Sequence, residues 1–191
     1  RQEHLPGALT QPEEFRLAVQ SMKDASLRPE VAAEEMRAPQ RIAPYSFAIS
    51  ADVAREEDEA TGRLILLHDP DGNDVWEGTF RCVAYVRADI DPETIEDGLL
   101  SGVAWSWLAD ALRDHDAPYT AASGTVTLVT TDSYGSMADD ESVAQIEIRA
   151  SWTPTDPGTL IPHARAWALL TASACGLLPA GEGVARLTRH R

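Results

Sequence analysis

The chain has 191 residues, of which 43% are apolar and 25% are charged, so it is long enough to bury a core and its composition is typical of a folded protein. Its net charge of −15 at pH 7 argues against nucleic acid or an anionic membrane as the main partner, because such partners are bound through clustered Lys and Arg. Cys82 and Cys175 are too few and too far apart for a disulfide framework or a cysteine zinc site. No signal peptide or membrane span is recognisable, which predicts a cytoplasmic protein.

The spacing of apolar residues predicts a single α+β domain over residues 10–179, with mobile termini at 1–9 and 180–191. No internal repeat is present, and no linker is long enough to divide the chain.

The first predicted helix covers residues 11–26, because Thr10 and Glu13 have the spacing of a capping box. The segment 28–41 contains two prolines and is ambiguous between a short helix at 31–36 and an extended arm, so it stays unassigned.

A period of two, typical of a strand, begins at Ile42 and continues to Val53. The strongest local feature is a predicted hairpin over residues 62–91, in which Asp69–Gly72 supplies a tight turn. From Trp76 onward its second arm alternates apolar with polar residues, which indicates a sheet with one buried side and one polar side.

A second helix is predicted from Ser101 to Asp114, followed by strands at 124–131 and 143–152 and a last helix that ends at Gly176. The predicted fold is two-layer α+β, an antiparallel sheet of about five strands with helices packed on one face, in the order α-β-β-β-α-β-β-α.

The sequence predicts no catalytic residue, no metal site and no bound cofactor, because it lacks a Gly-rich phosphate loop, a nucleophile elbow and histidines at metal-pair spacing. His68 beside Asp69 could act as a general base oriented by a carboxylate, or simply bond the hairpin.

A basic sheet face is the first part of the candidate ligand or partner surface. Its residues come from the polar sides of two predicted strands: Arg81, Tyr85, Arg87 and Arg149. The alternative is that these arginines pair across strands with Glu77 and Glu147.

The helix from Ser101 to Asp114 supplies the second part, since its apolar surface is wider than one sheet contact requires. Residues two apart point about 200° apart on a helix, so only one of Trp105 and Trp107 can lie at the centre of the core stripe. Trp107 is expected there, where replacement by Ala should cost roughly 3–5 kcal/mol. Trp105 and Leu112 are expected to form a partner or dimer surface, the alternative being that Trp105 packs under the loop 91–100.

Four strings of residues occur in the order Ile42-Ala43-Pro44-Tyr45, His68-Asp69-Pro70, Trp105-Ser106-Trp107-Leu108 and Arg149-Ala150-Ser151-Trp152-Thr153-Pro154. With them the sequence resembles, over about residues 12–180, an actinobacterial family catalogued as a domain of unknown function, number three thousand. The resemblance implies an actinobacterial cytosolic protein and supplies no activity, substrate or catalytic residue. The predicted order of elements also resembles the type three secretion chaperone-like fold, small acidic homodimers that bind extended polypeptide segments.

The leading hypothesis is a non-enzymatic, acidic binding or chaperone-like module that acts as a homodimer and has a protein partner. The alternative is a small-molecule binding protein or enzyme in which Arg81, Arg87 and Arg149 hold an anion. A tetrapyrrole is a special case, suggested because members of the resembled family are encoded near haem-synthesis genes. A deep pocket containing these arginines would favour the alternative, whereas a flat, ion-paired face would favour the first hypothesis.

Overall fold

One antiparallel sheet organises the molecule. The computed structural model describes residues 10–55, 58–96 and 98–176, and the termini predicted to be mobile, 1–9 and 180–191, lie outside them. Within these ranges the strands are β1 (Ala32–Met36), β2 (Tyr45–Arg55), β3 (Asp58–Asn73), β4 (Gly78–Ile90), β5 (Tyr119–Thr131) and β6 (Val143–Pro154). The helices are α1 (Glu13–Asp24), α2 (Leu100–Asp114) and α3 (Ile161–Ala174), with 3₁₀ turns η1 (Pro92–Ile95) and η2 (Gly135–Met137).

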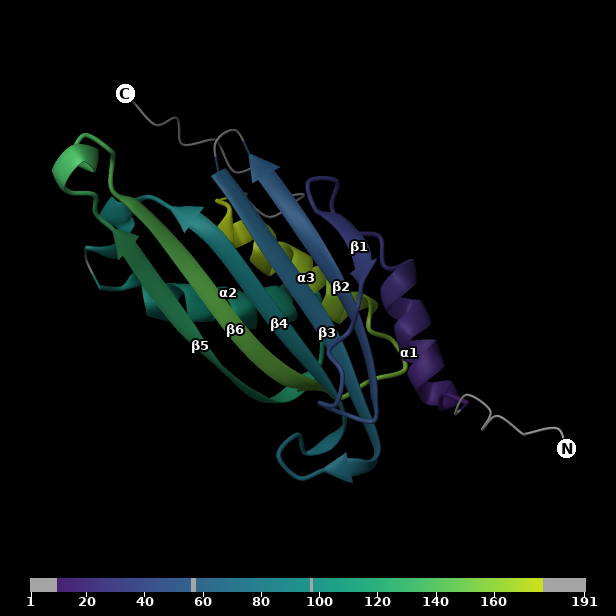
Figure 1. The fold of residues 1–191 in the computed structure, drawn as a ribbon. Coiled ribbons are helices and arrows are strands. Elements are labelled where there is room, and N and C mark those ends of the chain that lie inside the picture. The colour runs from purple at the N-terminus through teal and green to yellow at the C-terminus, as the bar shows by residue number, and fades with distance from the viewer. Residues whose placement is uncertain (1–9, 56–57, 97, 177–191) are drawn as a thin grey trace, which may run out of the picture.

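The strands lie in the order β1-β2-β3-β4-β6-β5, and each is antiparallel to its neighbours (Figure 1). The chain leaves β4, passes through α2 and enters the sheet again at its far edge as β5. It then returns as β6 between β5 and β4. The two edge strands of the sheet therefore come from different parts of the chain: β1 lies near the N-terminus and β5 in the second half.

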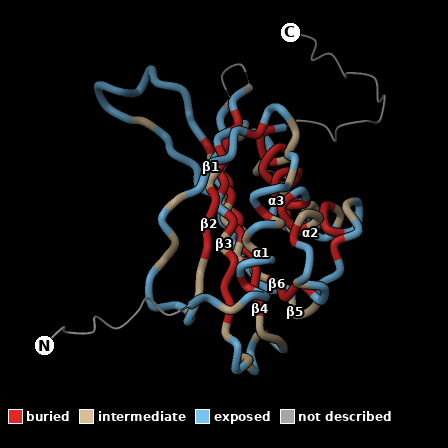
Figure 2. The backbone as a smooth tube through the Cα atoms, turned by 90° about the vertical axis from the view of Figure 1, so that its right-hand side faces the viewer, coloured by how far each residue is buried: buried red, intermediate tan, exposed pale blue. Residues whose placement is uncertain are grey.

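The helices cover one face of the sheet, and the buried residues gather between the two layers (Figure 2). α3 packs against the central strands β3 and β4. Its approach depends on Gly62, since a Cβ at that position would lie 2.7 Å from Thr171 Oγ1 and 3.1 Å from Trp167 Nε1. A larger residue at this position would push α3 away from β3.

The predicted alternation of β4 is confirmed: Phe80, Cys82 and Ala84 are buried beneath the helices, and the residues between them face the other way. Both cysteines are buried, and burial raises the pKa of Cys82 to about 12. No helix in the described ranges is long and apolar enough to cross a membrane.

The α+β class, the antiparallel sheet and the helical layer are confirmed, but the number of strands is not. The structure has a sixth strand, β1, inside the unassigned segment 28–41. β1 is an edge strand with no fully buried residue, so it lacks the alternation from which a strand is recognised.

The position of the hairpin turn is also corrected. The chain reverses at Asp74–Glu77, and the predicted turn Asp69–Gly72 lies within an irregular part of β3. The reason is local: the side chain of Asn73 accepts hydrogen bonds from the backbone N–H groups of Val75 (2.9 Å) and Trp76 (3.3 Å), which stabilises the later turn.

Candidate functional site

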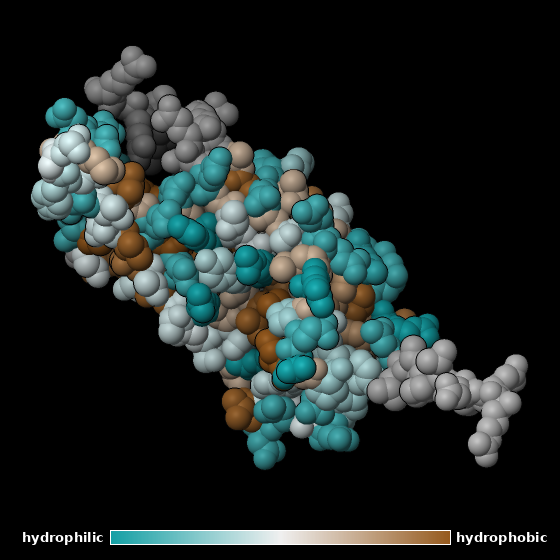
Figure 3. Space-filling model, viewed as in Figure 1, coloured by the Kyte–Doolittle hydropathy of each residue, from teal (hydrophilic) through white to brown (hydrophobic). Residues whose placement is uncertain are grey.

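The sheet face opposite the helices, called here the open face, carries the predicted arginines. Ladder register places Arg63 of β3, Tyr85 of β4 and Arg149 of β6 side by side. The two guanidinium carbons lie 5.6 and 5.5 Å from the centre of the Tyr85 ring, within cation–π range on both sides. Figure 3 views this face, which is mainly hydrophilic with smaller hydrophobic areas.

Two of the predicted arginines already have partners on the open face. Arg149 Nε lies 2.6 Å from Glu147 Oε1, and Arg87 Nη2 donates to Gln145 Oε1 at 2.5 Å. Tyr85 Oη donates to the second oxygen of Glu147 at 3.2 Å. Arg149 therefore pairs with Glu147 along its own strand rather than across strands. The polar side chains in this part of the face thus largely bond to one another.

Arg81 differs from the other three arginines because it is buried, with 5% of its surface exposed. Among the described residues its guanidinium donates to three hydroxyl groups: Nη1 to Thr153 Oγ1 at 3.0 Å, and Nη2 to Ser151 Oγ at 2.8 Å and to Ser123 Oγ at 3.3 Å. No ion pair joins it to a carboxylate of the described residues. Burial lowers the pKa of Arg81, and the charges of Cys82 and Glu77 oppose that shift.

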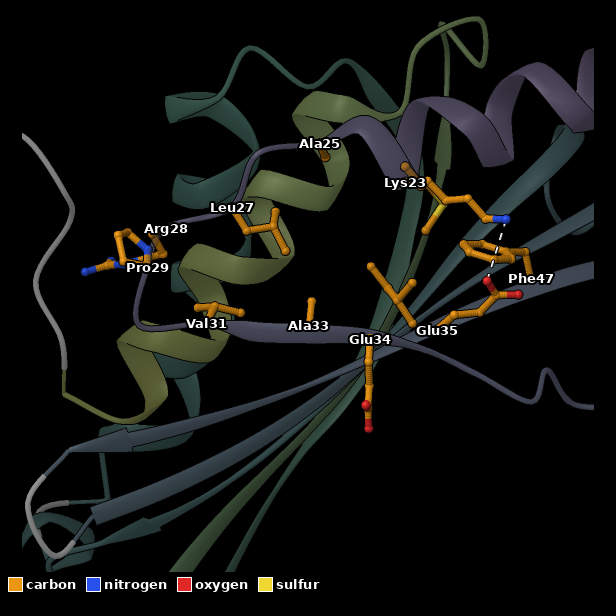
Figure 4. Close-up of a pocket in the computed structure, with 12 residues that line it drawn as sticks. Lys23, Ala25, Leu27, Arg28, Pro29, Val31, Ala33, Glu34, Glu35 and Phe47 are labelled. Atoms are coloured by element: carbon orange, nitrogen blue, oxygen red, sulfur yellow. Dashed lines mark ion pairs between the residues drawn. The ribbon is translucent and has the colours of Figure 1, made fainter.

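A cavity of about 370 Å³, called here the β1 slot, lies between β1, β2 and the chain that leaves α1 (Figure 4). Its apolar lining includes Met22, Ala25, Leu27, Val31, Ala33, Phe47 and Ile49. Figure 4 shows Leu27, Val31 and Ala33 pointing into the space, whereas Glu34 points away from it. None of the open-face arginines lines the slot.

One end of the β1 slot is closed by an ion pair. Lys23 Nζ lies 3.6 Å from Glu35 Oε2 and 5.4 Å from the centre of the Phe47 ring. Both side chains of the pair are well exposed, so the closure is easily displaced. Lys23 is the only lysine in the sequence.

The region around β5, called here the β5 end, collects exposed apolar side chains. Of the ten large apolar side chains that are exposed in the described residues, seven fall between positions 99 and 143: Leu99, Val103, Tyr119, Val129, Tyr134, Met137 and Val143. β5 itself is a 13-residue edge strand with no charged residue and no proline.

The residues predicted on α2 are placed differently from one another. Trp105 and Trp107 are both partly buried, so neither lies at the centre of the core. The ring of Trp105 lies over β5, since a Cβ on Gly124 would be 2.8 Å from its Cζ3 atom. Leu112 is fully buried beside Ala111, which corrects its assignment to a partner surface.

His68 is buried and bonded at both ring nitrogens, Nε2 to Glu14 Oε1 at 3.0 Å and Nδ1 to Thr79 O at 2.8 Å. Its ring stacks on Phe80 at 4.0 Å and on Phe15 at 5.9 Å. The partner carboxylate therefore comes from α1 and not from the adjacent aspartate. The hypothesis of a general base is not supported, because an enclosed imidazole cannot reach a substrate.

Within the described parts of the chain, no group of three or more His, Cys, Asp or Glu side chains could hold a metal ion. A family model described as protein of unknown function (DUF3000) matches residues 11–185. The chain belongs to the DUF3000 family. No curated protein and no solved structure matches this DUF3000 protein significantly.

Sequence reasoning missed two parts of this arrangement. Arg63 alternates with apolar residues in its strand, as Arg81 does, but only the strand order shows that it flanks Tyr85. The β1 slot could not be found at all, because its lining comes from a strand that the sequence left unassigned.

Proposed function

We propose that this DUF3000 protein is a non-enzymatic, homodimeric module that binds an extended polypeptide segment at β1. The observation that carries the proposal is the β1 slot, an apolar cavity that lies directly behind an exposed edge strand. An edge strand offers unpaired backbone groups to an extended segment, and a cavity beside it can take one of the segment's side chains. No catalytic group is required for this activity.

The charges around the slot indicate the partner's chemistry. Two cationic side chains, Lys23 and Arg28, and three carboxylates, those of Glu30, Glu34 and Glu35, lie in the lining or at the rim of the slot. Glu30 is paired with Arg28, at 3.2 Å from its Nε, and Glu35 is paired with Lys23. One carboxylate of β1 therefore remains in excess, that of Glu34, which points away from the slot. In a molecule of net charge −15, a segment with basic residues beside an apolar one would fit best.

The homodimer is assigned to the β5 end. Long, uncharged edge strands pair with other chains unless they are covered. Two copies of β5 related by a two-fold axis would bring together no like charges, because the strand has none. The apolar side chains on either side of β5 would add buried area to such a contact.

The small-molecule alternative has less support. The slot lies away from Arg81, Arg87 and Arg149, and all three arginines already have hydrogen-bonding partners on the open face. Nothing in the arrangement favours a flat tetrapyrrole over any other ligand.

Peptide selection tests the binding site. A phage-displayed library of random dodecapeptides would be selected on the full chain, and we expect enrichment of sequences with an apolar residue between basic ones. Ala33→Phe should abolish capture of the selected peptides, because Ala33 points into the slot. Ala32→Phe is the matched control, since Ala32 is also exposed but lies opposite Asp52, on the open face. Equal capture by both variants would reject the slot.

Sedimentation at micromolar concentration tests the dimer. Val129→Lys should shift the protein to monomer, because it places like charges near each other across the axis. Val75→Lys, at an exposed valine in the β3–β4 turn, should leave the dimer intact. A wild-type protein that sediments only as a monomer would remove the homodimer from the proposal.

A further inference from the structure

We propose that Arg81, Ser123 and Ser151 form a binding site on the open face for a small oxyanion, with a singly charged carboxylate as the preferred group. This site is separate from the β1 slot and does not depend on the proposed function.

No carboxylate of the described residues neutralises the charge of Arg81 through an ion pair. Buried cations in proteins are normally paired with a carboxylate, because hydroxyl groups compensate a full charge poorly. Arg81 is 5% exposed, and its described partners are three hydroxyl groups. The charge of Glu77 opposes the lowering of the Arg81 pKa by burial, but Glu77 forms no ion pair with Arg81. An oxyanion would supply the missing counter-charge.

The hydroxyl protons of Ser123 and Ser151 point away from Arg81. Ser123 Oγ and Ser151 Oγ both accept hydrogen bonds from Arg81 Nη2, so their own protons point elsewhere. Thr153 is different, because its hydroxyl donates to Trp76 O at 2.5 Å. The two serine oxygens lie 3.5 Å apart, a long contact that leaves at least one proton for a ligand. The positive charge of the guanidinium and at least one free hydroxyl proton thus meet at one point.

An irregularity in β5 brings Ser123 next to Ser151 and Arg81. Thr120 pairs with Thr153 on the open face, and two residues further along a regular strand Ala122 would occupy the next open-face position. A register shift between Thr120 and Ser123 places Ser123 opposite Ser151 instead. Ala121 takes a φ of 53° in this irregularity, a left-handed conformation that is unfavourable for alanine. Such irregularities re-aim side chains next to functional sites.

The net charge of the molecule favours an oxyanion of low charge. A net charge of −15 repels a doubly charged phosphate more than a carboxylate. Ser123 is exposed, so a carboxylate can approach Arg81 from solvent over its hydroxyl group.

The test is a titration of the full chain with sodium acetate and, separately, sodium phosphate, followed through the arginine Nε–Hε signals in ¹H–¹⁵N spectra at constant ionic strength set with sodium chloride. We expect a saturable shift of the Arg81 signal with acetate. Ser123→Ala/Ser151→Ala should weaken acetate binding about tenfold or more, which corresponds to about 1.4 kcal/mol. Arg81→Met should abolish it, whereas Arg87→Met, six residues further along β4 on the same face, should change it less than about twofold.

The serine variant keeps the test decisive if Arg81→Met fails to fold, because it leaves the buried guanidinium in place. Tighter binding of phosphate than of acetate would overturn the preference for a carboxylate. An identical response to chloride, unchanged binding in the serine variant, or equal loss in Arg87→Met would overturn the site itself.

Discussion

The two edge strands of the sheet, β1 and β5, differ in length and in charge. β1 is five residues long and carries two glutamates, whereas β5 is 13 residues long and carries no charge. Short, charged edges resist pairing with copies of themselves, and long, uncharged ones invite it. From this contrast we propose that β1 disfavours self-association and favours a partner of opposite charge, and that β5 pairs with a second copy of the chain.

The edges are also held differently. Behind β1 lies a cavity closed at one end by the exposed Lys23–Glu35 ion pair. Behind β5 the ring of Trp105 lies directly on Gly124, with α2 packed against the strand. We therefore expect substitutions at the β5 end to affect stability more than those at β1.

The largest effect is expected for Gly124→Ala. A Cβ there would lie 2.1 Å from Arg149 O and 2.8 Å from Ala150 Cα, and backbone atoms cannot yield. We expect the free energy of unfolding to fall by about 3 kcal/mol or more in urea denaturation. Gly102→Ala is the control: nothing lies within 4 Å of its Cβ in α2, so it should stabilise the protein by roughly 0.5–1 kcal/mol. A mild effect at Gly124 would contradict the close approach of the β6 backbone to this position.

Acidification should weaken β6, the strand that holds β5. Trp152 Nε1 donates to His163 Nδ1 at 2.9 Å, and burial lowers the pKa of His163 to about 4, against an opposing effect of Asp156. The unfolded chain binds this proton near pH 6.5 and the folded chain only near 4, so stability is fully present above 6.5 and falls as the pH drops through that window.

We expect His163 to contribute a loss of about 3 kcal/mol between pH 7 and 4. Urea denaturation of wild type and of His163→Gln at both pH values isolates it, because the other titrating groups are common to the two proteins. Equal pH dependence of the two would contradict the assignment.

A smaller effect is expected for Trp105→Ala. Full burial of a Trp side chain would make its loss cost about 3–5 kcal/mol, and this ring is partly exposed, so we expect about 2 kcal/mol in thermal or urea unfolding. Because the ring supports β5, the variant should also weaken self-association in sedimentation. Trp107→Ala should destabilise the protein without changing assembly, and a parallel change in assembly would contradict a specific role for Trp105.

The smallest effect is expected at β1. Lys23→Met removes an exposed ion pair and should change the free energy of unfolding by less than about 1 kcal/mol. It should nevertheless alter capture of basic peptides by the β1 slot, because it frees the carboxylate of Glu35. Peptide binding and urea denaturation measured on the same sample separate the two effects. A large loss of stability would show that the pair supports the fold.

Local patterns were sufficient for part of this structure. The period-two alternation of β4 predicted that Arg81, Tyr85 and Arg87 share one face, and the register confirms it. Local patterns did not predict β1, because its side chains are too exposed to alternate between buried and exposed. They also misplaced the hairpin turn, because the side chain of Asn73 stabilises a turn later in the chain. The sequence therefore predicted which residues of β4 share the open face, but not which side chains they bond to.

The α+β class, the helices and strands with strong periodicity, and the polar face of β4 follow from residues that lie close together along the chain. Three features depend instead on the folded arrangement: Arg63 lies beside Tyr85, Arg81 is surrounded by hydroxyl groups from β5 and β6, and a cavity lies behind β1. Strand order and register join residues far apart in the chain, such as Arg81 and Ser151, and no local period encodes that pairing.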